Sequence, residues 1–318
     1  MLAGVLGFPW LRYLGFLLSP LIFLMLFFTF CKVNPLDLRL HRWHWIALLF
    51  QVICTLVAYY ALLPLDPVLA QGIMLCFIMP AAAASPIIAG KLGGSIQSLT
   101  SFTILSNIAT ALFVPLFFPV VNPAADISFT DAFLKILSKV GPLLLGPFLL
   151  AWAVRLLYNA IQRKHGQKRE FRLSRSWAQL PFYLWALSLV VLMAQITWSL
   201  VYDDYNVWVA VAQGAGALVA CLIQFFAGKW IGEHFPSLPH GEDYKDVLVS
   251  DEIDADDVTL QTRISAGQAL GQKNTTLGVW MANTYLNPIA ALGAAAYIVW
   301  QNLFNSWQLA RAAKGKRV

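Results

Sequence analysis

Lys273 lies where a charged side chain is energetically unfavourable. Lys273 lies in the sequence Gly-Gln-Lys-Asn-Thr-Thr-Leu-Gly at 271–278, within a segment that we predict to span a membrane, and every Asp and Glu lies outside the predicted spans. A lysine at the centre of a membrane helix costs about 2.5–3.5 kcal/mol on insertion scales. Residues that carry this cost usually bind a substrate, an ion or a proton, so Lys273 is the first candidate for a functional group.

Two of the predicted spans should be discontinuous. Pro80 and Pro86 bracket the sequence Pro-Ala-Ala-Ala-Ala-Ser-Pro, and each removes a backbone donor in the middle of a span. Gly267, Gly271 and Gly278 surround the polar run that contains the lysine. Broken helices in two parts of a chain indicate the binding site of a secondary transporter, where the N-termini of half-helices can face an anionic substrate.

Amide side chains inside the predicted spans need hydrogen-bond partners, because an unpaired amide is costly in an apolar environment. Gln51, Asn274 and Asn302 are such residues, and we expect them near the site. Most serines and threonines in spans bond the backbone of their own helix, so they are weaker candidates.

The elements that position these residues follow from composition. The chain has 318 residues, of which 59% are hydrophobic and 12% charged, whereas soluble domains carry about 25% charged residues. This composition predicts an all-α polytopic membrane protein and excludes a soluble enzyme. It also argues against nucleic-acid binding, since no basic patch is interleaved with aromatic residues on a soluble domain. The expected partners are a lipid bilayer and a small solute.

We predict nine membrane spans, because apolar runs of about 20 residues recur along the chain. The predicted spans are 13–32, 43–63, 68–90, 96–121, 140–161, 178–199, 207–231, 264–286 and 289–309. In an alternative with eight spans, 277–304 forms one long helix and Lys273 falls in a loop. Pro288 interrupts that long helix, which favours nine spans.

Basic residues predict the orientation. With the N-terminus outside, most of the 22 Lys and Arg residues fall in the inner loops and the C-terminal tail, as the positive-inside rule requires. We therefore expect an integral protein of the cell (inner) membrane with a cytoplasmic C-terminus. The segment 233–263 is rich in Asp and Glu and is expected to be a solvated cytoplasmic loop.

Catalytic and metal-binding constellations are not expected. The predicted spans contain no Ser/His pair, no carboxylate pair and no His/Glu metal cluster, so an enzyme is not indicated. Cys31, Cys54, Cys76 and Cys221 lie in apolar runs without paired spacing, which suits packing better than metal or thiol chemistry.

Several segments resemble the bile acid:sodium symporter family. Residues 269–278 are similar to the family motif Glu-x-Gly-x-Gln-Asn-x-x-Leu, and residues 80–85 and 94–115 to its Pro-Gly-Gly-x-x-Ser-Asn region and the Ser/Thr-rich helix that follows. Residues 299–302 and the basic tail resemble the end of the family sequence, and Gln51 matches a family glutamine. The resemblance covers nearly the whole chain.

The resemblance implies one transmembrane transporter domain over 1–318 that works by alternating access. Inverted repeats would build a panel domain from spans 13–32, 140–161 and 178–199 and a core domain from 43–121 and 207–309. Spans three and eight would be the two discontinuous helices that cross in the core. The substrate-binding residues would be Ser85, Lys273, Asn274, Thr275, Gln301 and Asn302.

The family's sodium site appears here in altered form. Its equivalents are Gln51, Ser85, Thr103, Ala269, Gln272 and Lys273. The resemblance places Ala269 where the family has a sodium-binding glutamate and Lys273 where it has a glutamine ligand. A charged Lys273 would repel sodium at 4 Å by about 4 kcal/mol at an effective dielectric of 20. We therefore expect no cofactor, no metal and no bound sodium, with the ammonium in place of the ion.

The predicted function is sodium-independent transport of a small, carboxylate-like or bile-acid-like organic anion. Lys273 could exchange a proton and couple transport to it, or it could stay charged and support uniport or exchange. Three alternatives stay open: a sodium symporter with displaced ligands, an arsenite-type oxyanion exporter, and a non-transporting membrane sensor.

Overall fold

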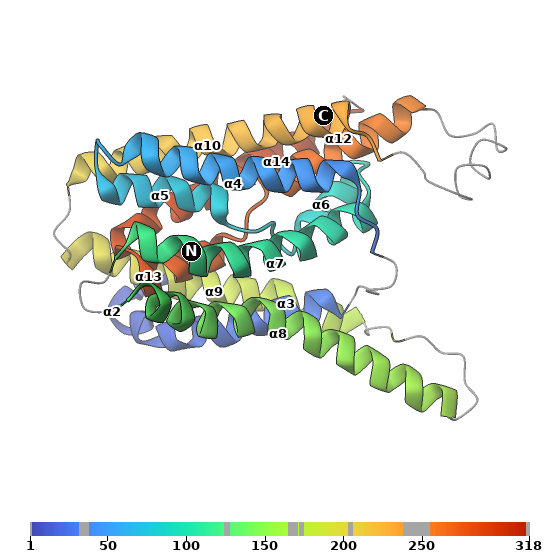
Figure 1. The fold of residues 1–318 in the computed structure, drawn as a ribbon, viewed down its shortest axis with the longest axis horizontal. Helices are drawn as coiled ribbons and strands as arrows, with labels where there is room; N and C mark the ends of the chain where they lie inside the picture. The colour runs from blue at the N-terminus through green and yellow to red at the C-terminus, as the bar shows by residue number, and fades with distance from the viewer. Residues whose placement is uncertain are drawn as a thin grey trace. The chain divides into compact units, whose positions relative to one another are not determined.

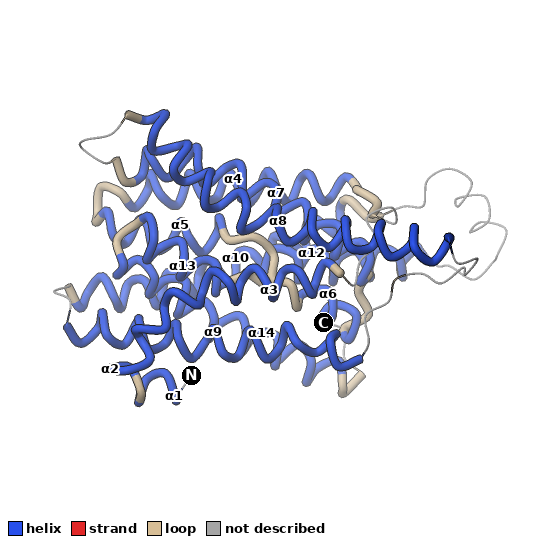
Figure 2. Tube along the Cα trace, turned by 90° about the horizontal axis from the view of Figure 1, so that it is seen from below, coloured by secondary structure: helices blue, strands red, loops and turns tan. Residues whose placement is uncertain are grey.

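The computed structural model describes residues 2–31, 38–123, 128–164, 171, 175–202, 206–237 and 255–315. Over these residues the regular structure is helical, with no strand and an isolated antiparallel bridge between Ala81 and Lys273 (Figure 2). The helices are α1 Leu2–Leu6, α2 Phe8–Leu11, η1 Arg12–Leu17, α3 Leu18–Phe30, α4 Arg42–Leu62, α5 Pro67–Ile78, α6 Ser85–Lys91, α7 Ile96–Val121, α8 Phe129–Lys164, α9 Arg175–Tyr202, α10 Val207–His234, α12 Ala255–Gly271, α13 Thr275–Tyr285, η3 Pro288–Ala290 and α14 Ala291–Ala312.

Six helical segments among the described residues are long and apolar enough to cross a membrane. They are Phe8–Phe30, Arg42–Leu62, Ile96–Val121, Phe129–Lys164, Tyr183–Tyr202 and Val207–His234. The predicted all-helical membrane protein is therefore confirmed. The count of nine spans stays a prediction, because the third and eighth predicted spans correspond to pairs of shorter helices, α5 with α6 and α12 with α13, and the ninth, α14, is not among these six segments.

Both predicted breaks are present. Helix α5 ends at Ile78, before Pro80 removes a backbone donor, and α6 begins at Ser85 with Pro86 in its first turn, where the missing N–H costs nothing. The second break separates α12 from α13. The alternative of one helix over 277–304 is wrong, because α13 ends at Tyr285 and α14 begins at Ala291, after Pro288.

Two helix boundaries differ from the sequence-based expectation. Helix α8 runs from Phe129 to Lys164, well beyond the predicted 140–161, because its polar ends continue the helix past the apolar run. Helix α12 begins at Ala255, inside the predicted acidic loop 233–263. Asp257 lies in its first turn, where the helix dipole favours negative charge. Residues 238–254 of that loop lie outside the described residues.

The chain divides into two compact units. Unit 1 comprises Met1–Asp37, Asn107–Ala210 and Thr276–Leu292, and unit 2 comprises Leu38–Ser106, Val211–Thr275 and Gly293–Val318. The three spans that the family resemblance assigns to a panel all fall in unit 1, together with the second half of α7 and helix α13. The division into panel and core stays a prediction.

In unit 1, helix α3 packs against both α8 and α9 (Figure 1). The short helices α1 and α2 pack on α9. Arg155 of α8 is buried and donates from Nη2 to the carbonyl of Cys31, just past the end of α3, at 3.2 Å. This bond satisfies a carbonyl that has no partner within its own helix.

In unit 2, helix α4 packs along α5, and α12 packs on α4 and α6 (Figure 1). Its apolar cluster includes Trp43, Ala47, Ala81, Leu99, Phe102 and Ala269, all fully buried. Helices α10 and α12 approach closely through glycines: a Cβ added at Gly228 would lie 2.8 Å from the Cα of Gly267. Small residues allow membrane helices to pack at this distance.

Candidate functional site

The two breaks meet as a pair of extended segments in unit 2. The bridge pairs Ala81 with Lys273 in antiparallel orientation. Two backbone hydrogen bonds flank it, from the Ala82 N–H to the Gln272 carbonyl (2.8 Å) and from the Asn274 N–H to the Pro80 carbonyl (2.9 Å). The bonds lost at each helix break are thus replaced across the crossing, which is how irregular backbone is tolerated at membrane depth.

Side chains from two other helices form hydrogen bonds with the outward-facing backbone groups of these two segments. The Ala81 N–H donates to Ser106 Oγ of α7 at 3.1 Å. On the opposite edge, the Lys273 N–H donates to Gln301 Oε1 of α14 at 2.9 Å. Tyr297, one turn before Gln301, donates its hydroxyl to the Gly271 carbonyl at 3.0 Å. The crossing is therefore bonded to α7 on one side and to α14 on the other.

The Lys273 side chain points to the end of α5. Its ammonium is fully buried and donates to Gln51 Oε1 at 3.1 Å and to the Phe77 carbonyl at 3.2 Å. The carbonyls at the end of a helix lack partners in that helix and carry a partial negative charge. The Nζ of Lys273 thus lies among oxygen acceptors from α4 and α5.

Gln51 completes this arrangement. Its Nε2 donates to the carbonyls of Ile78 (3.1 Å) and Met79 (3.3 Å), while its Oε1 accepts from the lysine. One amide therefore orients the ammonium and satisfies two further carbonyls at the end of α5. Its side chain is 3% exposed, so these bonds are shielded from water.

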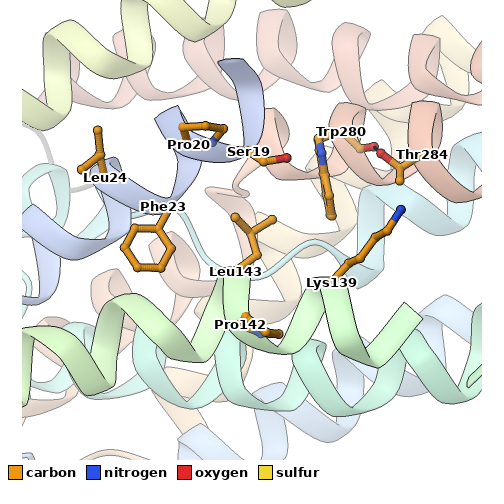
Figure 3. A pocket seen from close by; sticks show the side chains of 9 residues that line it. All are labelled: Ser19, Pro20, Phe23, Leu24, Lys139, Pro142, Leu143, Trp280 and Thr284. Atoms are coloured by element: carbon orange, nitrogen blue, oxygen red, sulfur yellow. Dashed lines mark hydrogen bonds between the residues drawn. The ribbon is translucent and has the colours of Figure 1, made fainter. Parts of the chain in front are cut away.

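A separate groove of about 780 Å³ lies in unit 1. Its lining residues come from α3, α8 and α13: Ser19, Pro20, Phe23, Leu24, Lys139, Pro142, Leu143, Trp280 and Thr284. Figure 3 shows the ammonium of Lys139 beside Thr284 at one end and the apolar side chains of Phe23 and Leu24 at the other. The groove is more open than an enclosed ligand-binding cavity. Its polar and apolar ends suit an elongated amphipathic ligand with a negative group.

The comparison of the sequence with protein families now identifies the family. The profile of the SBF-like CPA transporter family matches residues 15–312, which include both breaks. The chain belongs to the SBF-like CPA transporter family. Membership places it among membrane transporters and confirms the resemblance at this level. A comparison with curated proteins finds none that matches.

Within this SBF-like chain, the structure brings together some of the predicted site residues. Gln51, Lys273 and Gln301 are joined by the bonds described above. Asn274 and Thr275 are buried at the start of α13, and Ser85 donates to the Ala82 carbonyl at 2.7 Å at the start of α6. Gln272 accepts from the backbone of the other extended segment through its carbonyl.

Other predicted residues lie apart from this network or bond elsewhere. Ala269 is fully buried in the apolar cluster of unit 2. Thr103 donates to the Leu99 carbonyl of its own helix at 2.9 Å. Asn302 donates to Ile298 one turn earlier at 2.7 Å, and so does not share the role of its neighbour Gln301.

Ser106, Tyr297 and the Phe77 carbonyl were not among the predicted site residues. A carbonyl has no signature in a sequence. Tyr297 precedes Gln301 by four residues and therefore lies on the same helix face, which is a signal that could have identified it.

A buried Ser/His pair corrects one expectation. His44 Nε2 lies 3.1 Å from Ser98 Oγ, and both side chains are buried. The His41 N–H donates to His44 Nδ1, so a neutral His44 carries its proton on Nε2 and donates to the serine. A histidine in this tautomer cannot accept the Ser98 proton, and the pair therefore fits a structural role at the start of α4.

Cysteine chemistry has little structural support at the crossing. Cys76 is fully buried and donates to the Gly72 carbonyl of its own helix at 3.4 Å. No group of three or more His, Cys, Asp or Glu side chains that could hold a metal occurs within the part of the chain that the structure describes.

Proposed function

We propose that this SBF-like protein is a secondary transporter of small organic anions that works by alternating access without sodium. In this proposal the ammonium of Lys273 replaces the sodium ion of the related symporters. The observation that supports it most is the pair of bonds from the ammonium to Gln51 Oε1 and to the Phe77 carbonyl.

Electrostatics supports the replacement. An amide oxygen and a helix-terminal carbonyl are ligands that a sodium ion would also use, and the ammonium binds them already. A second unit charge at 4 Å would be repelled by about 4 kcal/mol at an effective dielectric of 20. Ala269, at the position of the family glutamate, is packed among apolar residues and offers no carboxylate.

A proton is the coupling ion that we favour. An amine can take up and release a proton, which the amides around Lys273 cannot do. If Lys273 instead stays charged throughout the cycle, the protein performs uniport or exchange. Both mechanisms are independent of sodium and are separated by the response to a pH gradient.

The organic-anion substrate is supported by the groove in unit 1. It combines an apolar wall with an exposed lysine, Lys139, at one end. Its shape suits a carboxylate or sulfonate on an apolar body better than a compact oxyanion. The Cys76 bond to its own helix also gives no support to an arsenite-type exporter.

Uptake by purified protein in liposomes tests the role of Lys273. We expect uptake to be unchanged when choline replaces sodium and to respond to an imposed pH gradient. Lys273→Gln should abolish that response, whereas Lys229→Gln, which removes another buried lysine of unit 2, should retain it. Sodium-stimulated uptake that Lys273→Gln leaves unchanged would refute the proposal.

The groove is tested separately with Lys139→Gln. Loss of a contact worth about 1 kcal/mol at an exposed site should raise KM for an amphipathic anion about fivefold and leave kcat nearly unchanged. Lys135→Gln is the matched control, because Lys135 is exposed one turn earlier on α8 and does not line the groove. Equal effects of the two substitutions would show that general surface charge, not the groove, attracts the anion.

A further inference from the structure

A row of buried amides connects α12 and α14 in unit 2. The Lys273 N–H bonds Gln301 at 2.9 Å at one end of the row, and Gln268 Nε2 donates to Gln308 Oε1 at 2.6 Å at the other. Gln301 and Gln308 are seven residues apart on α14, which corresponds to about 10 Å along a helix axis. Each of these four side chains is at least nine-tenths buried.

Two further buried amides belong to this row. Gln272 lies just past the end of α12, and its N–H donates to the Gln268 carbonyl at 3.0 Å. Asn305 follows Gln301 by four residues and lies on the same face of α14. Their side chains are 3% and 4% exposed. Asn305 thus lies between Gln301 and Gln308 along α14, and Gln272 lies next to Lys273.

Three polar atoms in this row lack hydrogen-bond partners among the described residues: Gln268 Oε1, Gln272 Nε2 and Asn305 Oδ1. A buried polar atom without a partner costs about 1–3 kcal/mol, so three in one row are not expected to stay unpaired. Water satisfies such groups when a site is polar and offers two to four partners. Here Gln268 Oε1 and Asn305 Oδ1 can accept hydrogen bonds from water, and Gln272 Nε2 can donate one to water.

We propose that the amide row binds a file of internal water that reaches the main chain of Lys273. The file would start at Gln261, which is exposed on α12. Ser265 and Gln268 lie on the same face of α12, closer to the crossing. Because the ammonium lies on the α5 side of the extended segment, the file hydrates the backbone of the break and not the ammonium itself. The inference depends on neither the substrate nor the coupling ion.

Cysteine accessibility tests this proposal without a transport assay. In a variant whose four native cysteines are replaced by alanine, Asn305→Cys is treated with a small hydrophilic methanethiosulfonate in inside-out vesicles. Ala269→Cys is the matched control, since Ala269 is equally buried but lies in the apolar cluster. We expect the thiol at 305 to react at least about tenfold faster, because internal water gives the reagent a polar path.

Added Gln268→Leu should close the path and slow the reaction at 305 to the rate of the control. Gln272→Cys serves as a second reporter if Asn305→Cys does not fold. Equal rates at 305 and 269 would overturn the proposal. Protection of the thiol by sodium but not by choline would also overturn it, since the amides would then hold a cation.

Discussion

Lys273 and Gln51 form the smallest unit on which the site depends. The lysine contributes the charge, and the glutamine contributes the acceptor that fixes it while bonding the carbonyls of Ile78 and Met79. Removing one partner of a buried polar pair leaves the other unpaired, which costs more than the pair itself contributes. The two residues should therefore behave as a coupled pair in mutational experiments.

Gln51→Leu should lower the free energy of unfolding by about 2–3 kcal/mol, because it leaves a buried ammonium with one acceptor fewer. The double variant Gln51→Leu/Lys273→Leu should be more stable than the sum of the single changes predicts. Thermal unfolding of the four proteins in detergent measures the coupling. Gln51→Glu keeps an acceptor for the ammonium but loses the donor to the Ile78 and Met79 carbonyls, so it should recover only part of the stability. Strictly additive effects would show that the ammonium does not depend on Gln51.

At the scale of elements, the crossing depends on close helix contacts as well as on polar bonds. Helix α12 leads directly into the second break, and α10 supports it through Gly228 and Gly232. A Cβ at Gly232 would lie 2.7 Å from the Cα of Arg263, so the conflict is with backbone and cannot be relieved by a rotamer change. These contacts set the close spacing between α10 and α12, the helix that precedes the break.

Gly232→Ala should lower the free energy of unfolding by about 1–3 kcal/mol, as overpacking in a close contact does. Gly214→Ala is the control on the same helix, because a Cβ there meets nothing within 4 Å. That change should be neutral or slightly stabilising, since alanine has the higher helix propensity. Apparent Tm in detergent measures both. A Gly232→Ala protein with unchanged Tm would show that α10 and α12 can move apart without loss of stability.

The sequence predicted the elements better than it predicted the bonds between them. Pro80, Pro86 and Pro288 mark helix ends through backbone chemistry that is local, so the breaks were predictable. The beginning of α12 inside the acidic segment was not, because hydropathy does not detect a polar helix turn. The pairing of Ser106 with Ala81 joins distant residues and depends on packing, which no local pattern records.

At the scale of the whole molecule, the basic residues predict that the N-terminus lies outside and the C-terminus in the cytoplasm. In a protein without native cysteines, Thr130→Cys near the start of α8 and Lys314→Cys after the end of α14 report on opposite sides of the membrane. A membrane-impermeant thiol reagent added to intact cells should label the first and not the second. Labelling of position 314 alone would reverse the proposed orientation.

If the Lys273 ammonium takes the place of a free sodium ion, as proposed, its covalent attachment has an energetic consequence for the cell. A free ion fills its site according to its concentration, so both occupancy and stability change with salt. A tethered amine is present with a stoichiometry of one at every sodium concentration, because its effective concentration is set by its own side chain. A protein of the proposed design would give up the energy stored in a sodium gradient, and in return its crossing would stay intact when external salt is scarce.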